Sequence, residues 1–208
     1  MLPGKRWRVG LGVLFIGALL GAATWHHVAR TRPNHLRTVV PGILYRSAWP
    51  TESQLAAMVK RHGIRTVVNL CLQDEEVSLQ DDNWEREKRQ CRELGVSLVH
   101  FRLPGNTPPS EEQAREWLRI CAAPESQPVL VHCAQGVIRT NGVVAIYKVD
   151  TLGMNNETVL HSLPAFGHNL FKPKRKGLND FILAWKPGQT KADASEAGTV
   201  TVASTAAH

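Results

Sequence analysis

The sequence predicts an α/β fold in which a central, mainly parallel sheet is flanked by helices. Short runs rich in Val, Ile and Leu alternate along the chain with segments whose apolar residues recur at helical spacing. Two capping boxes, TESQ at 51–54 and SEEQ at 110–113, mark the starts of two helices. The 208 residues are 43% hydrophobic and 21% charged, which is enough to bury one sizeable core.

The expected elements follow one another in a strand–helix alternation. Apolar, β-branched runs predict strands at 42–47, 64–70, 96–101 and 128–132. The helix after the first capping box ends at Gly63, and the helix at 83–94 ends before Gly95, because glycine suits the C-terminal cap. Ala114, Trp117, Leu118 and Cys121 give the helix after the second capping box an apolar face. Further helices are expected at 139–150, 156–165 and 176–185.

The two ends of the chain differ from this alternating part. Residues 9–25 carry no charge and follow a basic start, so we expect residues 1–25 to be a single-pass membrane anchor, or a signal segment cleaved on export. Residues 26–38 are expected to be a basic linker and 39–186 a catalytic domain. Residues 187–208, rich in Ala, Thr, Ser and Gly, are expected to be a disordered tail. The sequence does not indicate which side of the membrane the catalytic domain would face.

Charge and cysteine content exclude some classes of protein. The formal net charge is +7, but the basic residues gather towards the ends and form no long stripe with aromatic residues, so we expect no nucleic-acid partner. The four cysteines, at 71, 91, 121 and 133, have no spacing typical of a metal knuckle. We therefore expect no metal and no other cofactor. The oligomeric state is left open.

The stretch VLVHCAQGVIRTNG, at 129–142, lies between a predicted strand and a predicted helix. A loop in this position turns backbone N–H groups towards the helix start and forms a nest for an anion. Cys133 would lie at the floor of that nest, where the helix dipole favours its thiolate. Gly136 permits backbone angles that a Cβ would resist, and Arg139 can hold two oxygens of a phosphate. The hydroxyl of Thr140 can lie near the sulfur.

These residues resemble the cysteine-dependent protein tyrosine phosphatase superfamily, in its dual-specificity branch. HCAQGVIRT at 132–140 is similar to that superfamily's His-Cys-x5-Arg-Ser/Thr signature, and the segments 42–55, 63–71 and 143–148 resemble further parts of its compact members. The resemblance covers about residues 38–170. It implies a dual-specificity phosphatase-like fold and hydrolysis of phosphate monoesters in a phosphorylated protein or a small ester.

The resemblance also implies a role for each residue of the signature. Cys133 would be the nucleophile that forms a cysteinyl-phosphate, and Arg139 would bind the phosphate and stabilise its charge. Thr140 would assist departure of the thiolate in the second step, and His132 would orient the loop. The phosphate would be held by the backbone of the loop, which consists of Ala134, Gln135, Gly136, Val137, Ile138 and Arg139.

A general acid is also implied, usually an aspartate on the loop before the helix that precedes the signature strand. The corresponding loop here, 102–113, has no aspartate, and Gly105 falls near the acid position. Glu111, Glu112 and Asp74 are candidates, although Glu111 and Glu112 also suit the first turn of a helix. Without an acid, the enzyme would depend on good leaving groups such as aryl phosphates.

Three further features refine the resemblance. Asn141 stands where the family commonly has glycine. The loop interior has no lysine or histidine, whereas relatives that act on inositol phosphates often carry basic residues there. The resemblance therefore favours a phosphoprotein or a simple ester over a highly phosphorylated inositol. Cys71 stands in an NLC context that some relatives share, and in those relatives this cysteine can pair with the nucleophile under oxidation. The resemblance therefore implies a reversible Cys71–Cys133 disulfide as a hypothesis, beside a plain buried cysteine.

Two other functions compete with an active phosphatase of phosphotyrosine or mixed specificity. A pseudophosphatase would bind a phosphorylated partner with little turnover, which the absent aspartate favours and the intact Cys133 and Arg139 oppose. A rhodanese-type sulfurtransferase would explain the cysteine but not the whole pattern from His132 to Thr140.

Overall fold

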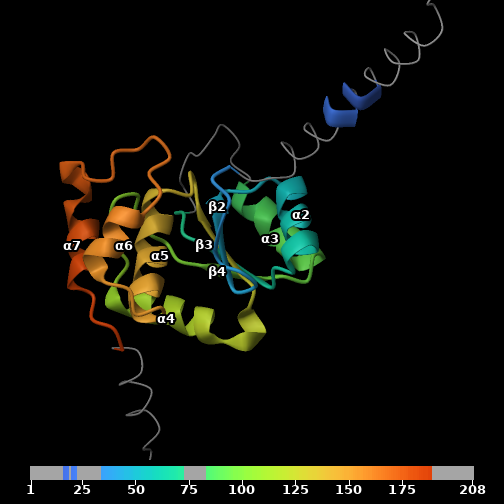
Figure 1. The fold of residues 1–208 in the computed structure, drawn as a ribbon. Coiled ribbons are helices and arrows are strands. Elements are labelled where there is room, and N and C mark those ends of the chain that lie inside the picture. Colours follow the sequence, from blue (N-terminus) through green and yellow to red (C-terminus); the bar gives the residue numbers. More distant parts are fainter. Residues whose placement is uncertain (1–15, 19, 23–33, 73–82, 189–208) are drawn as a thin grey trace, which may run out of the picture.

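A computed structural model describes residues 16–18, 20–22, 34–72 and 83–188, and places one five-stranded sheet at the centre of the domain (Figure 1). The strands are β1 (Arg37–Val40), β2 (Leu44–Ala48), β3 (Thr66–Asn69), β4 (Ser97–His100) and β5 (Val129–Cys133). Their order in the sheet is β1-β2-β5-β3-β4. β1 is antiparallel to β2, and the other neighbours are parallel.

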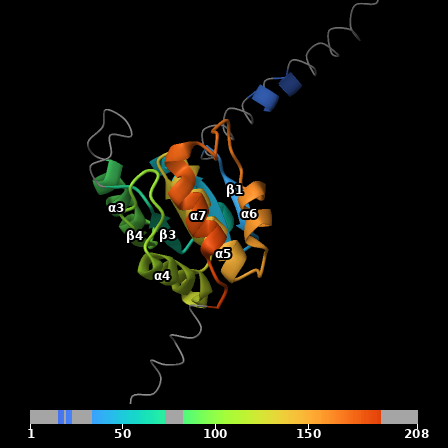
Figure 2. The same cartoon turned by 90° about the vertical axis from the view of Figure 1, so that its left-hand side faces the viewer.

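Helices cover both faces of the sheet. On one face lie α2 (Glu52–His62) and α3 (Asn83–Glu93). The other face carries α4 (Glu111–Ala122), α5 (Ile138–Asp150), α6 (Asn156–Ser162) and α7 (Lys176–Ala184), which Figure 2 shows stacked in front of the strands. Two short 3₁₀ turns, Pro124–Ser126 and Pro173–Arg175, connect these elements.

The alternation of side chains along β5 divides the core in two. Val129, Val131 and Cys133 belong to the cluster packed against α4, α5, α6 and α7, whereas Leu130 belongs to the smaller cluster under α2 and α3. This follows from the two-residue repeat of a strand, since successive side chains point to opposite faces. His132 therefore points away from the face on which Cys133 lies.

The structure confirms the predicted fold class and the predicted helix starts. Thr51 and Ser110 both cap their helices in complete capping boxes. Gly63 ends α2 in the left-handed conformation, with φ of 66°. The strand β1 was not expected, because it is four residues long, its first two residues are exposed, and it forms the edge of the sheet.

The expected single-pass membrane location is contradicted. Within the ranges that the structure describes, no helix is long and apolar enough to cross a bilayer. A spanning helix needs about 20 apolar residues, and the uncharged run at the start of the chain is shorter than that. Most of that run, like the predicted tail from 189 onwards and the linker up to residue 33, lies outside the described residues.

Candidate active site

The loop between β5 and α5 brings the signature residues together. Cys133 ends β5 and is 2% exposed. The hydroxyl of Thr140, in the first turn of α5, donates a hydrogen bond to the Cys133 Sγ at 3.1 Å. This hydrogen bond fixes the position of the sulfur beside the start of α5, as a nucleophile and leaving group requires.

The start of α5 is open to an anion. Val137 occupies the N-cap position without a side-chain capping bond, unlike the starts of α2 and α4. The first N–H groups of a helix have no partner within the helix, and the helix dipole is positive there. The described elements thus leave these donors beside Cys133, where a phosphate oxygen could accept from them.

Arg139 crosses the open end of the sheet. The residue is 7% exposed, and its Nη1 donates to the carbonyl oxygens of Leu103, at 3.2 Å, and Leu70, at 3.5 Å. Leu70 follows β3, and Leu103 lies on the loop that follows β4. These contacts hold the planar guanidinium at the carboxyl ends of β3 and β4, where its fork can bind two phosphate oxygens.

Gly136 allows the loop to lie directly on β2. Its φ is 63°, and a Cβ built on it would lie 2.2 Å from the Ser47 carbonyl oxygen and 2.4 Å from the Ala48 nitrogen. Such distances are incompatible with any side chain, because both neighbours are backbone atoms. The glycine predicted at the centre of the loop is therefore required by a close approach as well as by its backbone angle.

A buried polar chain lies behind the sulfur, on the α3 face of the sheet. His132 is fully buried, and its Nε2 lies 2.8 Å from the Glu87 Oε1. The other Glu87 oxygen accepts from the Asn69 Nδ2 at 2.6 Å, and the Asn69 Oδ1 accepts from the Cys71 N–H at 2.8 Å. Glu87 and Asn69 were not predicted, because only the tertiary structure brings α3 to the end of β5.

The candidates for a general acid are exposed or lie outside the described residues. Glu111 and Glu112 are exposed in the first turn of α4, and Glu111 pairs with Arg115 at 3.4 Å. Asp74 lies outside the described residues. The described loop 102–110 carries no carboxylate, and a Cβ added to Gly105 would meet no atom within 4 Å.

The next feature is the distribution of metal-binding side chains and cysteines over the described part of the chain. Within residues 34–72 and 83–188, no three His, Cys, Asp or Glu side chains lie together as they would around a metal ion. All four cysteines are buried, and burial raises the pKa of the Cys91 thiol to about 12. Cys71 and Cys133 belong to one core cluster, and their disulfide stays a prediction.

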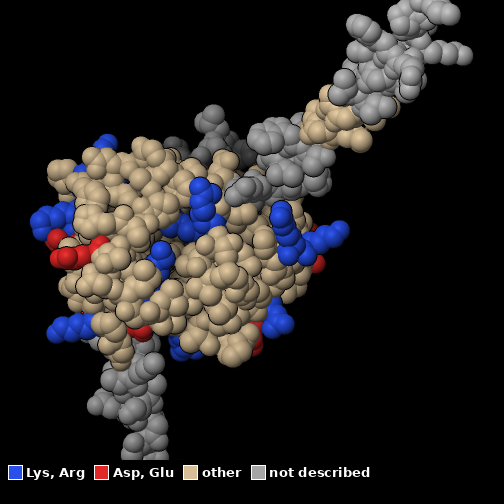
Figure 3. All heavy atoms as spheres, viewed as in Figure 1, with Lys and Arg blue, Asp and Glu red and all other residues tan. Residues whose placement is uncertain are grey.

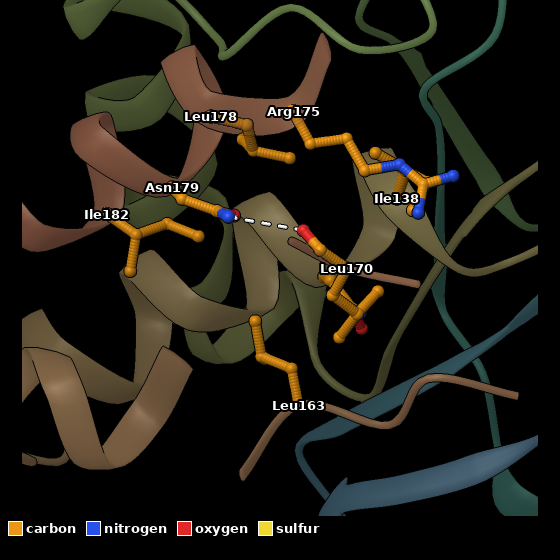
Figure 4. Close-up of a pocket in the computed structure, with 8 residues that line it drawn as sticks. Ile138, Leu163, Leu170, Arg175, Leu178, Asn179 and Ile182 are labelled. Atoms are coloured by element: carbon orange, nitrogen blue, oxygen red, sulfur yellow. Dashed lines mark hydrogen bonds between the residues drawn. The ribbon is translucent and has the colours of Figure 1, made fainter. Parts of the chain in front are cut away.

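An apolar pocket lies between α5 and α7 (Figure 4). Leu163, Leu170, Leu178 and Ile182 line it, and the Asn179 Nδ2 donates to the Leu170 carbonyl at 3.2 Å across it. Ile138 is its one contribution from the signature loop. Because Cys133 and Arg139 do not line this pocket, it belongs to the helix packing and not to the phosphate site.

Residues 21–175, most of the described chain, match the family described as "DSP-PTPase phosphatase fused to NAD+ Kinase". The chain belongs to this family. It is a member of the cysteine-dependent tyrosine phosphatase superfamily, in the dual-specificity branch, as the signature loop predicted.

Curated relatives from rice, Oryza sativa subsp. japonica, support this membership. The chain is 29% identical over 141 residues to "Inositol diphosphatase DSP2", covering 64% of this chain and 63% of that protein. It is 29% identical over 109 residues to "Inositol diphosphatase DSP1", covering 50% and 45%. The chain thus spans less than two thirds of the length of either relative.

Solved structures share the fold. The core catalytic domain of the PP-IP phosphatase SIW14 from S. cerevisiae aligns with a TM-score of 0.63, at 22% identity, over 80% of this chain and 94% of that one. TpbA of P. aeruginosa aligns with a TM-score of 0.58, at 20% identity, over 77% and 90%. Both similarities confirm the flanked, mainly parallel sheet of this phosphatase branch.

Proposed function

We propose that this member of the family hydrolyses phosphate monoesters through a cysteinyl-phosphate formed on Cys133. The hydrogen bond from Thr140 to the Cys133 Sγ, at the open start of α5, is the observation that carries this proposal. The thiolate attacks phosphorus while the bond from phosphorus to the leaving oxygen breaks. Water then attacks phosphorus, the S–P bond breaks, and the thiolate returns to the hydrogen bond from Thr140.

Each remaining residue of the loop has a part in this scheme. Arg139 binds two phosphate oxygens and stabilises the charge that spreads over them in the transition state. The backbone N–H groups along the loop hold the same oxygens. These residues belong to the domain predicted at 39–186, and none of these steps routes through a metal.

The scheme favours substrates with good leaving groups. General-acid catalysis is typically worth about 10²–10⁴-fold, and the described loop 102–110 offers no acid to protonate a poor leaving oxygen. A phenolate, whose conjugate acid has a pKa of about 10, leaves more readily than an alkoxide. We therefore favour a phosphotyrosine side chain, or another aryl phosphate, over phosphoserine.

The surface of the loop also bears on the substrate. Ala134, Gln135, Val137 and Ile138 add no charge around the phosphate. On the face shown in Figure 3, Lys and Arg side chains are spread out with uncharged surface between them. The uncharged loop interior favours a substrate with a single phosphate, as in a phosphorylated protein or a small ester.

An inositol diphosphate is the second candidate substrate. The rice relatives carry the name of inositol diphosphatases, and a phosphoanhydride also has a good leaving group, since phosphate departs without an added proton. This candidate needs cations outside the loop to hold the other phosphates.

Hydrolysis of para-nitrophenyl phosphate by the full chain, beside a Cys133→Ser variant, tests the proposal. We expect turnover that disappears in the variant. Phosphate binding without turnover in the parent would instead identify a pseudophosphatase. A comparison of kcat/KM for a phosphotyrosine peptide and for a diphosphoinositol polyphosphate then decides the substrate, and a preference for the latter would overturn our first choice.

A further inference from the structure

The outer side of the phosphate loop is held by a set of donors that the proposed reaction does not use. Three successive carbonyl oxygens each accept a hydrogen bond. Ala134 accepts from the Trp49 N–H at 3.2 Å, Gln135 from the His35 Nδ1 at 2.7 Å, and Gly136 from the Arg46 Nη2 at 2.5 Å. A carbonyl can only accept, so the His35 Nδ1 carries the proton.

These bonds fix the direction of the loop's N–H groups. In a trans peptide unit, the C=O and the following N–H point in opposite directions. The cis peptide of the described chain is Gln127–Pro128, so the peptide units of the loop are trans. Because the carbonyls of Ala134, Gln135 and Gly136 point outwards to their donors, the N–H groups of Gln135, Gly136 and Val137 point the other way.

Arg46 is buried in the middle of β2 and makes this contact from there. It is 2% exposed, and its Nη1 donates to the Asn141 Oδ1 at 2.5 Å. The Asn141 Nδ2 donates in turn to the Pro164 carbonyl at 3.1 Å, so the amide of Asn141 can present its oxygen only to the arginine. Burial is the main reason that the pKa of Arg46 falls to about 10, while the Cys133 charge raises it.

The ring of Phe166 contacts both His35 and Arg46, the two side chains that donate to the loop. Phe166 stacks on His35 with the ring centroids 4.1 Å apart and the planes at 16°, and the Arg46 guanidinium lies 5.8 Å from the same ring. Both His35 and Phe166 have positive φ, at 57° and 46°. Backbone in this region is strained for such residues and persists where the surroundings impose it, frequently at functional sites.

We propose that His35 and Arg46 are positioning residues that hold the phosphate loop in its anion-binding form before phosphate arrives, with Phe166 and Asn141 fixing the two donors. This inference rests on the proposed phosphate site but not on turnover. A loop released from these donors would be free to rotate its peptide units, and part of the binding energy of phosphate would be spent on ordering them.

The test is titration of inorganic phosphate into the Cys133→Ser full chain by calorimetry, with a second substitution added. We expect His35→Leu and Arg46→Met each to weaken phosphate binding about tenfold or more, in line with the cost of losing a preorganised donor. His35→Asn, whose Nδ2 can replace the ring Nδ1, should restore binding to within about threefold. Arg46→Lys, which keeps one donor but not the fork, should lie between.

Arg37→Met is the matched control. Its guanidinium lies over the same Phe166 ring, at 5.1 Å, but bonds only to the Leu36 carbonyl among the contacts described, so binding should not change. Thermal unfolding of each variant identifies any that fail to fold. If Arg46→Met is unfolded, the comparison of His35→Leu with His35→Asn decides the outcome, because His35 is only partly buried. Phosphate binding that is equal in His35→Leu and the parent would overturn the inference.

Kinetics in the Cys133 enzyme separate this inference from the proposed function. With turnover present, the inference expects KM for para-nitrophenyl phosphate to rise in His35→Leu. With turnover absent, phosphate binding by the two His35 variants still decides it. A general loss of stability would not raise KM in His35→Leu while leaving KM unchanged in His35→Asn.

Discussion

The loop 134–139 and the loop 102–110 lie at the same end of the sheet and meet at Arg139, yet they differ in how much of their chemistry is in place. The first has three carbonyls held from outside, a sulfur that accepts a hydroxyl proton, and an open helix start. The second offers Arg139 a backbone carbonyl, at Leu103, but no carboxylate for the leaving group.

This difference indicates which half of the reaction the fold supports. Binding the phosphate and stabilising its equatorial oxygens need backbone donors and a fixed arginine, and the described residues supply both. Protonating the leaving oxygen needs an acid within hydrogen-bond reach. The enzyme is therefore expected to discriminate among substrates by their leaving groups, and each prediction below alters one side of this comparison.

Replacing Arg139 should have the largest effect. Arg139→Met removes the only side-chain fork of the loop, and we expect kcat/KM for para-nitrophenyl phosphate to fall about 10³-fold. Arg119→Met is the control, since Arg119 is exposed on α4 and pairs with Glu116. A loss of less than tenfold at Arg139 would show that the backbone donors alone carry the charge.

Adding an acid to the second loop should reduce the difference between the two loops. Gly105→Asp places a carboxyl where a Cβ meets no atom within 4 Å, so the side chain fits. We expect hydrolysis of alkyl phosphates to rise about tenfold relative to aryl phosphates, because only the poorer leaving group needs the proton. Gly105→Asn, of the same shape without the acid, should leave the ratio unchanged, and an equal gain in both variants would contradict the reasoning.

The pH dependence of stability should show a smaller effect at the start of the second loop. Burial is the main cause that lowers the pKa of His100, so the unfolded state binds more protons as the pH falls below about 6.5. The free energy of unfolding should therefore decrease from pH 7.5 to pH 5.5, and denaturant titrations would measure this decrease. It should be smaller in His100→Asn but unchanged in His161→Asn, whose imidazole is exposed. Equal pH dependence in all three proteins would exclude His100 as a contributor.

Glu111 should have the smallest effect on activity. It is exposed, lies in the first turn of α4 and pairs with Arg115, as a helix-stabilising residue would. We expect Glu111→Gln to keep kcat within about twofold, with both the acid and the alkaline limb of the pH–rate profile unchanged. Loss of the alkaline limb of that profile, where the rate falls as a general acid is deprotonated, would instead identify Glu111 as the general acid.

Asn141 shows how the sequence and the structure divide the information. The sequence marked it as a departure from the family's glycine, without a role. In the fold its amide joins the buried Arg46 to the Pro164 carbonyl, which ties the outer side of the loop to the segment before α7. No local pattern could indicate this, because the partners lie 95 and 23 residues away in the chain.

The alternation of strands and helices, the two capping boxes, and the loop that contains Cys133, Arg139 and Thr140 could all be predicted from the sequence. These features depend on local physics: side-chain periodicity, cap hydrogen bonds and the geometry of a strand–loop–helix turn. The arrangement of His35, Arg46 and Glu87 around this loop arises only on folding, since each comes from a different element. A buried cation or carboxylate is stable only where such distant partners meet it, and that meeting exists only in the folded chain.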